Sequence, residues 1–301
     1  MNHLPARQNM LRGLTVKDAM RRQVIKLPQH ASVDKGINFL IKYKVSALLI
    51  TRDDRKPIGV VSKTDIMSAY YAAMPVDSPL ESIMSSPPLF CREDDSLESA
   101  LDRMRSERVY RLYAHGDDPD DVVGMLAYPD IVGLLYRYCH KCEYSLLRRG
   151  GRKLESTEVP RFLVKDVMTP KVEHFQERDS LTTVMEGLSA YRFGAMLITD
   201  GDGRPTGVVS KTDLILAYKH GVEAHQEAAR IMSSPVLSCD QGEFLEEAIR
   251  LMIFSEVHRL FIHKDYSANV VGVFSLSDAA RLRSGSCQAC VSSRIKVEQT
   301  D

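Results

Sequence analysis

The sequence predicts a mixed fold of strands and helices, of class α/β (α+β). It is built from four similar units. The heptapeptide Gly59–Asp65 recurs unchanged as Gly207–Asp213, and the offset of 207 − 59 = 148 residues holds without a gap from about residue 14 to residue 142. Weaker copies stand 65 residues further on, at Gly124–Asp130 and Gly272–Asp278. An internal repeat must be recognised before any fold is proposed. The chain therefore has two similar halves, each made of two units of about 60 residues.

The first unit shows the order of elements that the other three repeat. Apolar residues at helical spacing after Ser32 predict an amphipathic helix, and the continuous apolar run Ala47–Thr51 predicts a strand that is buried on both faces. The predicted elements are helix 15–20, strand 24–27, helix 32–43, strand 47–51, strand 57–61 and helix 64–72. One such β-α-β-β-α unit cannot bury its sheet alone, so we expect the units to pair.

The composition is that of a soluble globular protein, for which we expect a cytoplasmic location. The apolar fraction of 44% is ordinary, and 40 basic residues balance 40 acidic ones, so no overall field attracts nucleic acid or an anionic membrane. No apolar run approaches the ~20 residues of a membrane-spanning helix. The basic run Arg148–Lys153 has no interleaved aromatic residues, so it is interpreted as a solvated linker.

The segment Ser62-Lys63-Thr64-Asp65 stands where a strand meets a helix, and it has two interpretations. In the first, Ser62 and Asp65 form a capping box that only starts the helix. In the second, the free amides of the helix N-terminus bind an anion and the carboxylate binds a ribose diol. The identity of the whole heptapeptide in both halves favours the second interpretation, a site for a nucleotide.

The β-α-β-β-α unit that ends in Gly-hydrophobic-hydrophobic-Ser/Thr-x-x-Asp resembles the cystathionine-beta-synthase (CBS) domain, which occurs in pairs called Bateman modules. The resemblance covers residues 14 to 285 and implies two Bateman modules packed as a disk. The expected organisation is four CBS units over 14–72, 80–138, 162–220 and 228–286, a linker over 143–160 and a polar tail over 287–301.

The resemblance also implies an adenosine ligand, whose ribose the motif aspartates bind and whose phosphates the hydroxyls and nearby basic residues meet. It places the ribose-binding carboxylates at Asp65, Asp130, Asp213 and Asp278. It places the hydroxyl contacts at Ser62, Thr64, Ser210, Thr212, Ser275 and Ser277. The second unit departs from this pattern, because Ala127 lacks the hydroxyl and Pro129 removes an amide donor. We therefore expect the site around Asp130 to be weak or empty.

The fourth unit is similar to the last repeat of the gamma regulatory subunits of AMP-activated protein kinases. The similarity lies in Val257-His258-Arg259-Leu260 and in the motif from Gly272 to Asp278. It implies that His258 and Arg259 face nucleotide phosphates, and Arg111 holds the equivalent place in the second unit. For His258 a half-buried strand residue is the alternative interpretation.

The six cysteines form three pairs at the same offset of 148 residues. Two Cys-x-x-Cys elements follow the second and fourth units, and their four thiols could complete a tetrahedral zinc site if the halves pack symmetrically. The candidate ligands are Cys139, Cys142, Cys287 and Cys290. A redox dithiol and inert packing remain the alternatives, because zinc motifs rarely have so long a gap between the pairs. Cys91 and Cys239 are predicted to be core residues on strands.

The favoured function is a regulatory protein that binds adenine nucleotides (AMP, ADP or ATP) and acts through a protein partner or through self-association as a homodimer. S-adenosylmethionine is an alternative ligand, and a metal- or redox-responsive module is the alternative function. The sequence shows no nucleophile elbow, His-Glu-x-x-His or Gly-x-Gly-x-x-Gly motif, so we do not expect an enzyme. We expect no membrane or nucleic-acid partner either.

Overall fold

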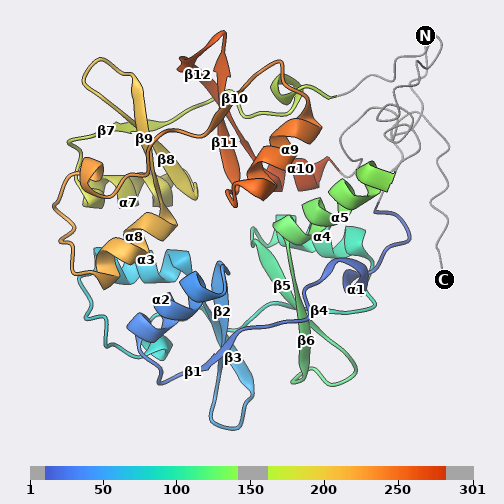
Figure 1. Ribbon diagram of the computed structural model, residues 1–301. Helices are drawn as coiled ribbons and strands as arrows, with labels where there is room; N and C mark the ends of the chain where they lie inside the picture. Colours follow the sequence, from blue (N-terminus) through green and yellow to red (C-terminus); the bar gives the residue numbers. More distant parts are fainter. Residues whose placement is uncertain (1–10, 142–161, 283–301) are drawn as a thin grey trace, which may run out of the picture.

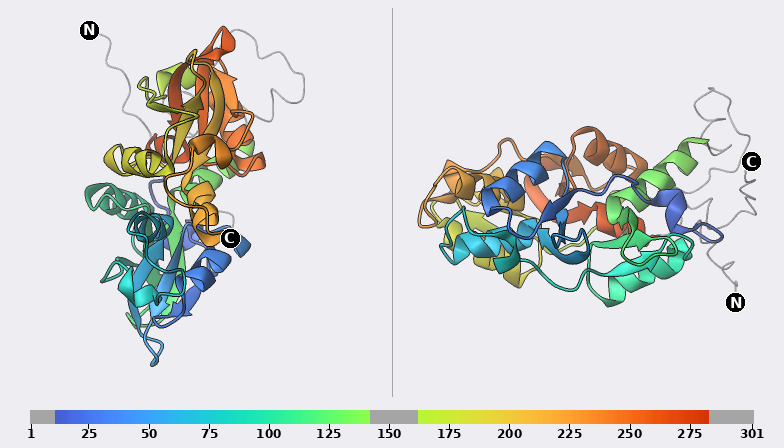
Figure 2. Two further views of the ribbon diagram at one scale, coloured as in Figure 1. Left: turned by 90° about the vertical axis from the view of Figure 1, so that its left-hand side faces the viewer. Right: turned by 90° about the horizontal axis from the view of Figure 1, so that it is seen from below.

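The computed structural model describes residues 11–141 and 162–282, which form four units around a common centre (Figure 1). Seen from two further sides the body is flattened, as expected for a disk (Figure 2). The strands are β1 Lys26–Pro28, β2 Ala47–Thr51, β3 Pro57–Ser62, β4 Phe90–Arg92, β5 Arg111–His115, β6 Val122–Ala127, β7 His174–Gln176, β8 Ala195–Thr199, β9 Pro205–Ser210, β10 Ser238–Asp240, β11 Arg259–Lys264 and β12 Tyr266–Ser275. The α-helices are α1 Val16–Ala19, α2 Val33–Lys42, α3 Lys63–Tyr71, α4 Leu97–Ser106, α5 Tyr128–Lys141, α7 Leu181–Ala190, α8 Lys211–Lys219, α9 Leu245–Phe254 and α10 Leu276–Arg281.

Each unit contains one three-stranded sheet in which the first pair of strands is parallel and the second antiparallel. The predicted elements of the first unit are confirmed within a residue or two, including the buried strand β2. The first strand differs most, since pairing with β2 begins only at Lys26 opposite Leu49, so β1 starts two residues later than the predicted 24–27. The residue before it, Ile25, still accepts a hydrogen bond from the Leu49 amide.

The units pair in two ways, through their sheets and through their helices. The sheets of units one and two meet at a small core in which Leu49 lies against Tyr113, Val122 and Met125. Helices α3 and α8 join units one and three, and a large core that includes Ile66 and Leu214 fills the space around them. These contacts hold the two halves together as the predicted pair of modules.

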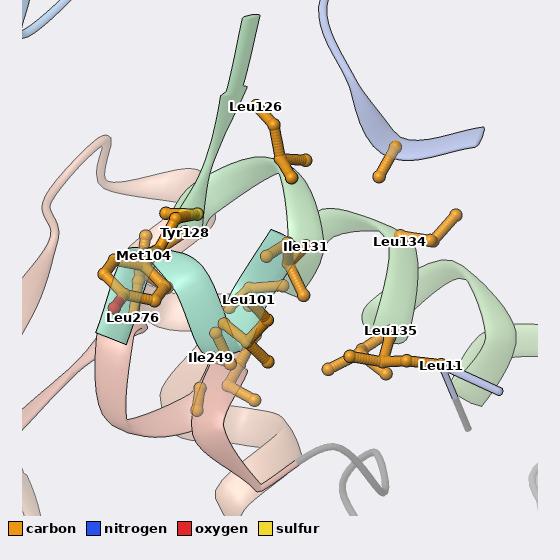
Figure 3. Close-up of a cluster of buried hydrophobic side chains, with 14 of the residues drawn as sticks. Leu11, Leu101, Met104, Leu126, Tyr128, Ile131, Leu134, Leu135, Ile249 and Leu276 are labelled. Atoms are coloured by element: carbon orange, nitrogen blue, oxygen red, sulfur yellow. The ribbon is translucent and has the colours of Figure 1, made fainter. Parts of the chain in front are cut away.

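Units two and four join through α5 and α10 around a second large core. Figure 3 shows Ile249 and Leu276 of the fourth unit gathered with Leu101, Met104 and Ile131 of the second. Because apolar burial is the dominant favourable term in association, these two cores fix the relative position of the modules.

A reciprocal pair of tyrosines locks the interface of units one and three. The rings of Tyr70 and Tyr218 stack with centroids 5.0 Å apart. The Tyr70 hydroxyl donates to the carbonyl of Val222 at 2.6 Å, and the Tyr218 hydroxyl donates to the carbonyl of Met74 at 2.5 Å. Burial raises the pKa of Tyr70 to about 12, so its hydroxyl keeps its proton at neutral pH.

Replacing Tyr70 or Tyr218 with phenylalanine is expected to lower the free energy of unfolding by about 1 kcal/mol each, because one buried carbonyl loses its donor. Urea denaturation of the purified variants measures this loss. Tyr71→Phe is the matched control, since the Tyr71 hydroxyl donates to Glu186 at the exposed surface and its loss should change stability little. An equal loss in the control would show that the interface position of Tyr70 is unimportant.

Within residues 11–141 and 162–282, no helix has the length and apolar character that crossing a membrane requires.

Candidate functional site

The two identical heptapeptides place two identical side-chain arrangements where β3 meets α3 and where β9 meets α8. Asp65 Oδ2 accepts hydrogen bonds from the amide of Ser62 at 2.7 Å and from its hydroxyl at 2.6 Å, and Oδ1 accepts one from Ser85 Oγ at 3.1 Å. Asp213 repeats the arrangement with Ser210 and Ser233, at 2.7, 2.6 and 3.2 Å. The capping box is therefore present, and each carboxylate also turns one oxygen outwards.

The backbone amides of the first helical turn do not form the predicted anion site. The amide of Lys63 donates to the carbonyl of Ser46 at 3.1 Å, and the amides of Thr64 and Asp65 donate to Ser62 Oγ at 3.2 and 3.4 Å. The side chain of Ser62 uses the donors that an anion would need, because capping satisfies the orphan amides of a helix start. Donors for an anion must therefore come from side chains.

Lysine side chains from the opposite half supply such donors. Lys63 Nζ donates to Thr212 Oγ1 at 2.7 Å, and Lys211 Nζ donates to Thr64 Oγ1 at 2.8 Å. Each motif is thus completed by an ammonium group from the other module. The residue between the capping serine and the threonine is the same in both heptapeptides, which explains why the two contacts are reciprocal.

Two arginines extend the positive charge towards the centre of the disk. Arg111 donates to Ser46 Oγ and lies 3.5 Å from the carbonyl of Ala47, so it reaches from the second unit onto the first. Arg259 donates to the carbonyl of Ala195 at 3.1 Å, from the fourth unit onto the third. Gly194 permits this, because a β-carbon there would lie 2.9 Å from Arg259 Nη2. The predicted equivalence of the two arginines is seen in their matching contacts.

The ionisation of these groups shows that their positive charges are close together. Burial, followed by the charge of Arg111, lowers the pKa of Lys63, and burial, followed by Arg259, lowers the pKa of Lys211 to about 8. Asp213 and Asp65 respectively oppose these shifts without cancelling them.

His258 lies next to this group of charges. Its side chain is exposed, yet crowding by protein atoms lowers its pKa, and the charges of Lys63, Arg259, Arg21 and Arg111 lower it further. His258 therefore lies beside the other basic residues, and its contact with nucleotide phosphates stays a prediction. The lowered pKa leaves His258 uncharged at pH 7. We refer to Lys63, Arg111, Lys211 and Arg259 as the central cation cluster.

The motifs of the second and fourth units differ from the identical pair. Asp278 Oδ2 accepts from the amide and the hydroxyl of Ser275 at 2.9 and 2.6 Å, and Ser277 Oγ lies 2.7 Å from Ser275 Oγ. Asp130 Oδ2 accepts only from the amide of Ala127 at 2.9 Å, since alanine has no hydroxyl, and Oδ1 accepts from Arg21 Nε. The four carboxylates are therefore not equivalent.

All thirteen predicted ligand-binding residues lie in described segments, at the four strand–helix junctions or beside them. The sequence did not predict three kinds of residue that contact the motifs. They are the cross-module lysines Lys63 and Lys211, the serines Ser85 and Ser233, and Arg21. The lysines carried a signal, because they are identical in both heptapeptides. Arg21 carried none, since its partner Asp130 is 109 residues away.

The predicted zinc ligands fall outside what the structure describes. Cys139 belongs to the last turn of α5, but its side chain and the residues Cys142, Cys287 and Cys290 lie outside the described residues. Within residues 11–141 and 162–282, no three or more His, Cys, Asp or Glu residues gather as metal ligands.

The two cysteines predicted on strands are found there. Cys91 on β4 is buried and Cys239 on β10 is half-buried. Burial raises both thiol pKa values to about 12, so neither thiol is reactive at neutral pH.

The repeat of four such motifs agrees with the comparison to known families. A family model of the CBS domain matches residues 16–72, 80–137, 164–220 and 228–285. The chain belongs to the CBS domain family. The four matches correspond to the four sheets with their helices, so each structural unit is one CBS domain.

Two archaeal proteins of solved structure have a fold similar to that of this chain. MJ1225 of Methanocaldococcus jannaschii, proposed to be an archaeal homologue of g-AMPK, covers 89% of this chain and 99% of its own, with a TM-score of 0.72 and 15% identity. In sequence it is 19% identical over 201 residues, which are 66% of this chain and 68% of MJ1225. An uncharacterised conserved protein of Pyrococcus horikoshii covers 90% of this chain and 100% of its own, with a TM-score of 0.58 and 18% identity. These low identities show the fold alone.

Proposed function

We propose that this CBS protein binds adenine nucleotides beside its motif aspartates and regulates a partner protein in response. The observation that carries the proposal is the juxtaposition of outward-facing carboxylates with the central cation cluster. A carboxylate accepts both hydroxyls of a ribose, as in dinucleotide-binding sites. Ammonium and guanidinium groups bind phosphate through charge-assisted hydrogen bonds. One ligand that presents a ribose and a phosphate satisfies both.

The cations favour a phosphate over other adenosine derivatives. Burial is the main cause that lowers the pKa values of Lys63 and Lys211, and the charges of Arg111 and Arg259 lower them further, so these cations lie close enough to repel one another. An anionic phosphate relieves this repulsion, whereas the sulfonium of S-adenosylmethionine adds to it. We therefore place AMP, ADP and ATP ahead of S-adenosylmethionine as ligands.

The crossed lysines give a physical route from binding to regulation. A nucleotide at Asp213 would contact Lys63 of the other module, and a nucleotide at Asp65 would contact Lys211 in the same way. Binding would exchange a lysine–threonine hydrogen bond for a lysine–phosphate contact at the module interface. A ligand shifts a conformational equilibrium by its differential affinity for the two states. A partner that contacts both modules would sense that shift.

Calorimetric titration of the purified chain with AMP, ADP, ATP and S-adenosylmethionine at pH 7 tests the proposal. We expect saturable heat with the nucleotides and weaker binding of S-adenosylmethionine. If only S-adenosylmethionine gives saturable heat, the ligand is S-adenosylmethionine and not a nucleotide. If folded protein, shown by cooperative unfolding, gives no binding heat with any of the four compounds, the proposed function is overturned.

The lowered pKa of Lys211 predicts that nucleotide affinity depends on pH. Free protein loses this positive charge as pH rises through about 8. Bound phosphate favours the charged form and so raises the pKa in the complex. Affinity should therefore be highest below pH 8 and fall above it, by at most about tenfold per pH unit for one proton. The second pKa of a phosphate monoester, near 6, is too low to contribute there.

Titration at pH 8.5 in two buffers of different ionisation enthalpy measures the expected proton uptake. Lys211→Arg is the control, because arginine stays charged throughout this range. Proton uptake that persists unchanged in Lys211→Arg would assign the pH dependence to another group.

A further inference from the structure

One structural position beside the motif aspartates is equivalent in all four CBS units. A methionine from the paired unit packs against the glycine that starts each motif, with its sulfur 2.4 to 2.7 Å from the place a β-carbon would take. The next residue then forms a bridge with the strand, at the position after that glycine. The four residues at this position are Arg21, Ser85, Thr169 and Ser233.

Three of the four residues are small and carry a hydroxyl. Ser85 and Ser233 donate to the outward oxygens of Asp65 and Asp213 at 3.1 and 3.2 Å. These are neutral contacts from exposed serines, so a ribose hydroxyl can take their place. Thr169 of the third unit holds the same place beside the motif of Asp278 in the fourth.

Arg21 is the exception and forms an ion pair with Asp130. Its Nε donates to Asp130 Oδ1, while the amide of Ala127 donates to the other oxygen. The side chain of Asp130 is only 4% exposed, compared with 25% for Asp278. The Arg21 side chain is 52% exposed, but its removal would leave the buried charge of Asp130 unpaired, so the pair resists exchange for a neutral hydroxyl.

We propose that Arg21 is a built-in occupant of the Asp130 site, which keeps a nucleoside ribose out and leaves Asp65, Asp213 and Asp278 as the ribose-binding carboxylates. The inference rests on the proposed nucleotide binding and adds to it the selection among sites. The guanidinium takes the carboxylate oxygen that a ribose diol would use. Because Arg21 lies on a segment before β1, the first unit of the chain closes a site whose aspartate belongs to the second.

The contacts around Asp130 agree with a closed site. Burial raises the pKa of Asp130, and the charge of Arg21 is the first factor that opposes the rise. Ala127 has no hydroxyl that could donate a hydrogen bond to the Asp130 carboxylate. In the fourth unit the hydroxyl of Ser275 donates such a bond to Asp278. Arg21 therefore supplies the only side-chain hydrogen bond that Asp130 receives within the described residues.

Exchanging the residues at this position tests the proposal with AMP as the probe. Calorimetry on Arg21→Ser should give one more bound AMP per chain than the wild type. Arg21→Ser combined with Asp130→Ala should lose that additional equivalent. The reciprocal variant Ser85→Arg should lose one equivalent, because the new arginine would cover Asp65 in the same way. Arg21→Thr, which copies the residue that the third unit has at position 169, repeats the first arm if the serine variant does not fold.

The outcomes separate this inference from the proposed function. An unchanged or lower number of bound AMP molecules in folded Arg21→Ser and Arg21→Thr would overturn the inference, and a lower number would make Arg21 a phosphate contact. Undiminished binding in Ser85→Arg would also contradict it. If the wild type binds no AMP, ADP or ATP, the proposed function fails first and the occupant role fails with it.

Discussion

Asp213→Ala is expected to weaken nucleotide binding at one site by about 100-fold. The carboxylate turns Oδ1 outwards past Ser233, where it can accept a ribose hydroxyl. Hydrogen bonds to a charged group contribute about 1.5–3 kcal/mol each, so two lost bonds exceed the roughly 2.7 kcal/mol that a 100-fold change requires. Calorimetric titration with AMP measures both the affinity and the number of sites.

Asp213 also caps helix α8, so the variant needs a control for lost capping. Asp18 forms the same capping box with Thr15, accepting from its amide at 2.7 Å and its hydroxyl at 2.9 Å, at a helix start outside the four motifs. Asp18→Ala should lower the free energy of unfolding by about 1 kcal/mol without changing AMP binding. Unaltered AMP binding in Asp213→Ala would remove this carboxylate from the site.

Replacing both cross-module lysines is expected to separate binding from stability. In Lys63→Met with Lys211→Met, AMP affinity should fall by about 10- to 100-fold at both sites, because each site loses one charge-assisted phosphate contact. Adenosine affinity should change little, since adenosine has no phosphate. The melting temperature should rise by a few degrees, because burial and the neighbouring arginines disfavour both charges in the folded protein.

Lys219 provides the matched control at the same interface. It donates to Asp34 at 2.6 Å across units one and three, at the opposite end of helix α8 from the motif. Lys219→Met should therefore leave AMP affinity unchanged and should not raise the melting temperature. If the double variant loses stability and keeps its AMP affinity, Lys63 and Lys211 act as structural contacts between the modules.

The repeated units could be predicted because their signals are local. The capping box of Ser62 and Asp65 spans three residues, and the apolar run that forms β2 is continuous. Helical spacing identified α2 to within a residue or two for the same reason. The order of strands and helices recurs in every unit, and the capping box recurs in three of the four motifs, so the interpretation of the first unit applied to the others.

The site could be predicted only in part because its decisive contacts join distant residues. Lys63 meets Thr212 across 149 residues, a contact fixed by the packing of α3 on α8 and by no pattern within a unit. The prediction that backbone amides form an anion site was wrong for another reason. A serine that caps a helix uses the same amides that an anion needs, and in both heptapeptides the serine occupies them.

The affinity of AMP relative to adenosine tests the central claim most directly. The claim is that carboxylates hold the ribose while the central cation cluster holds the phosphate. Titration of the wild-type chain with each compound at pH 7, at one salt concentration, gives the ratio. We predict that AMP binds at least about 100-fold more tightly, as two charge-assisted contacts imply. Equal affinities, or adenosine the tighter ligand, would contradict the account.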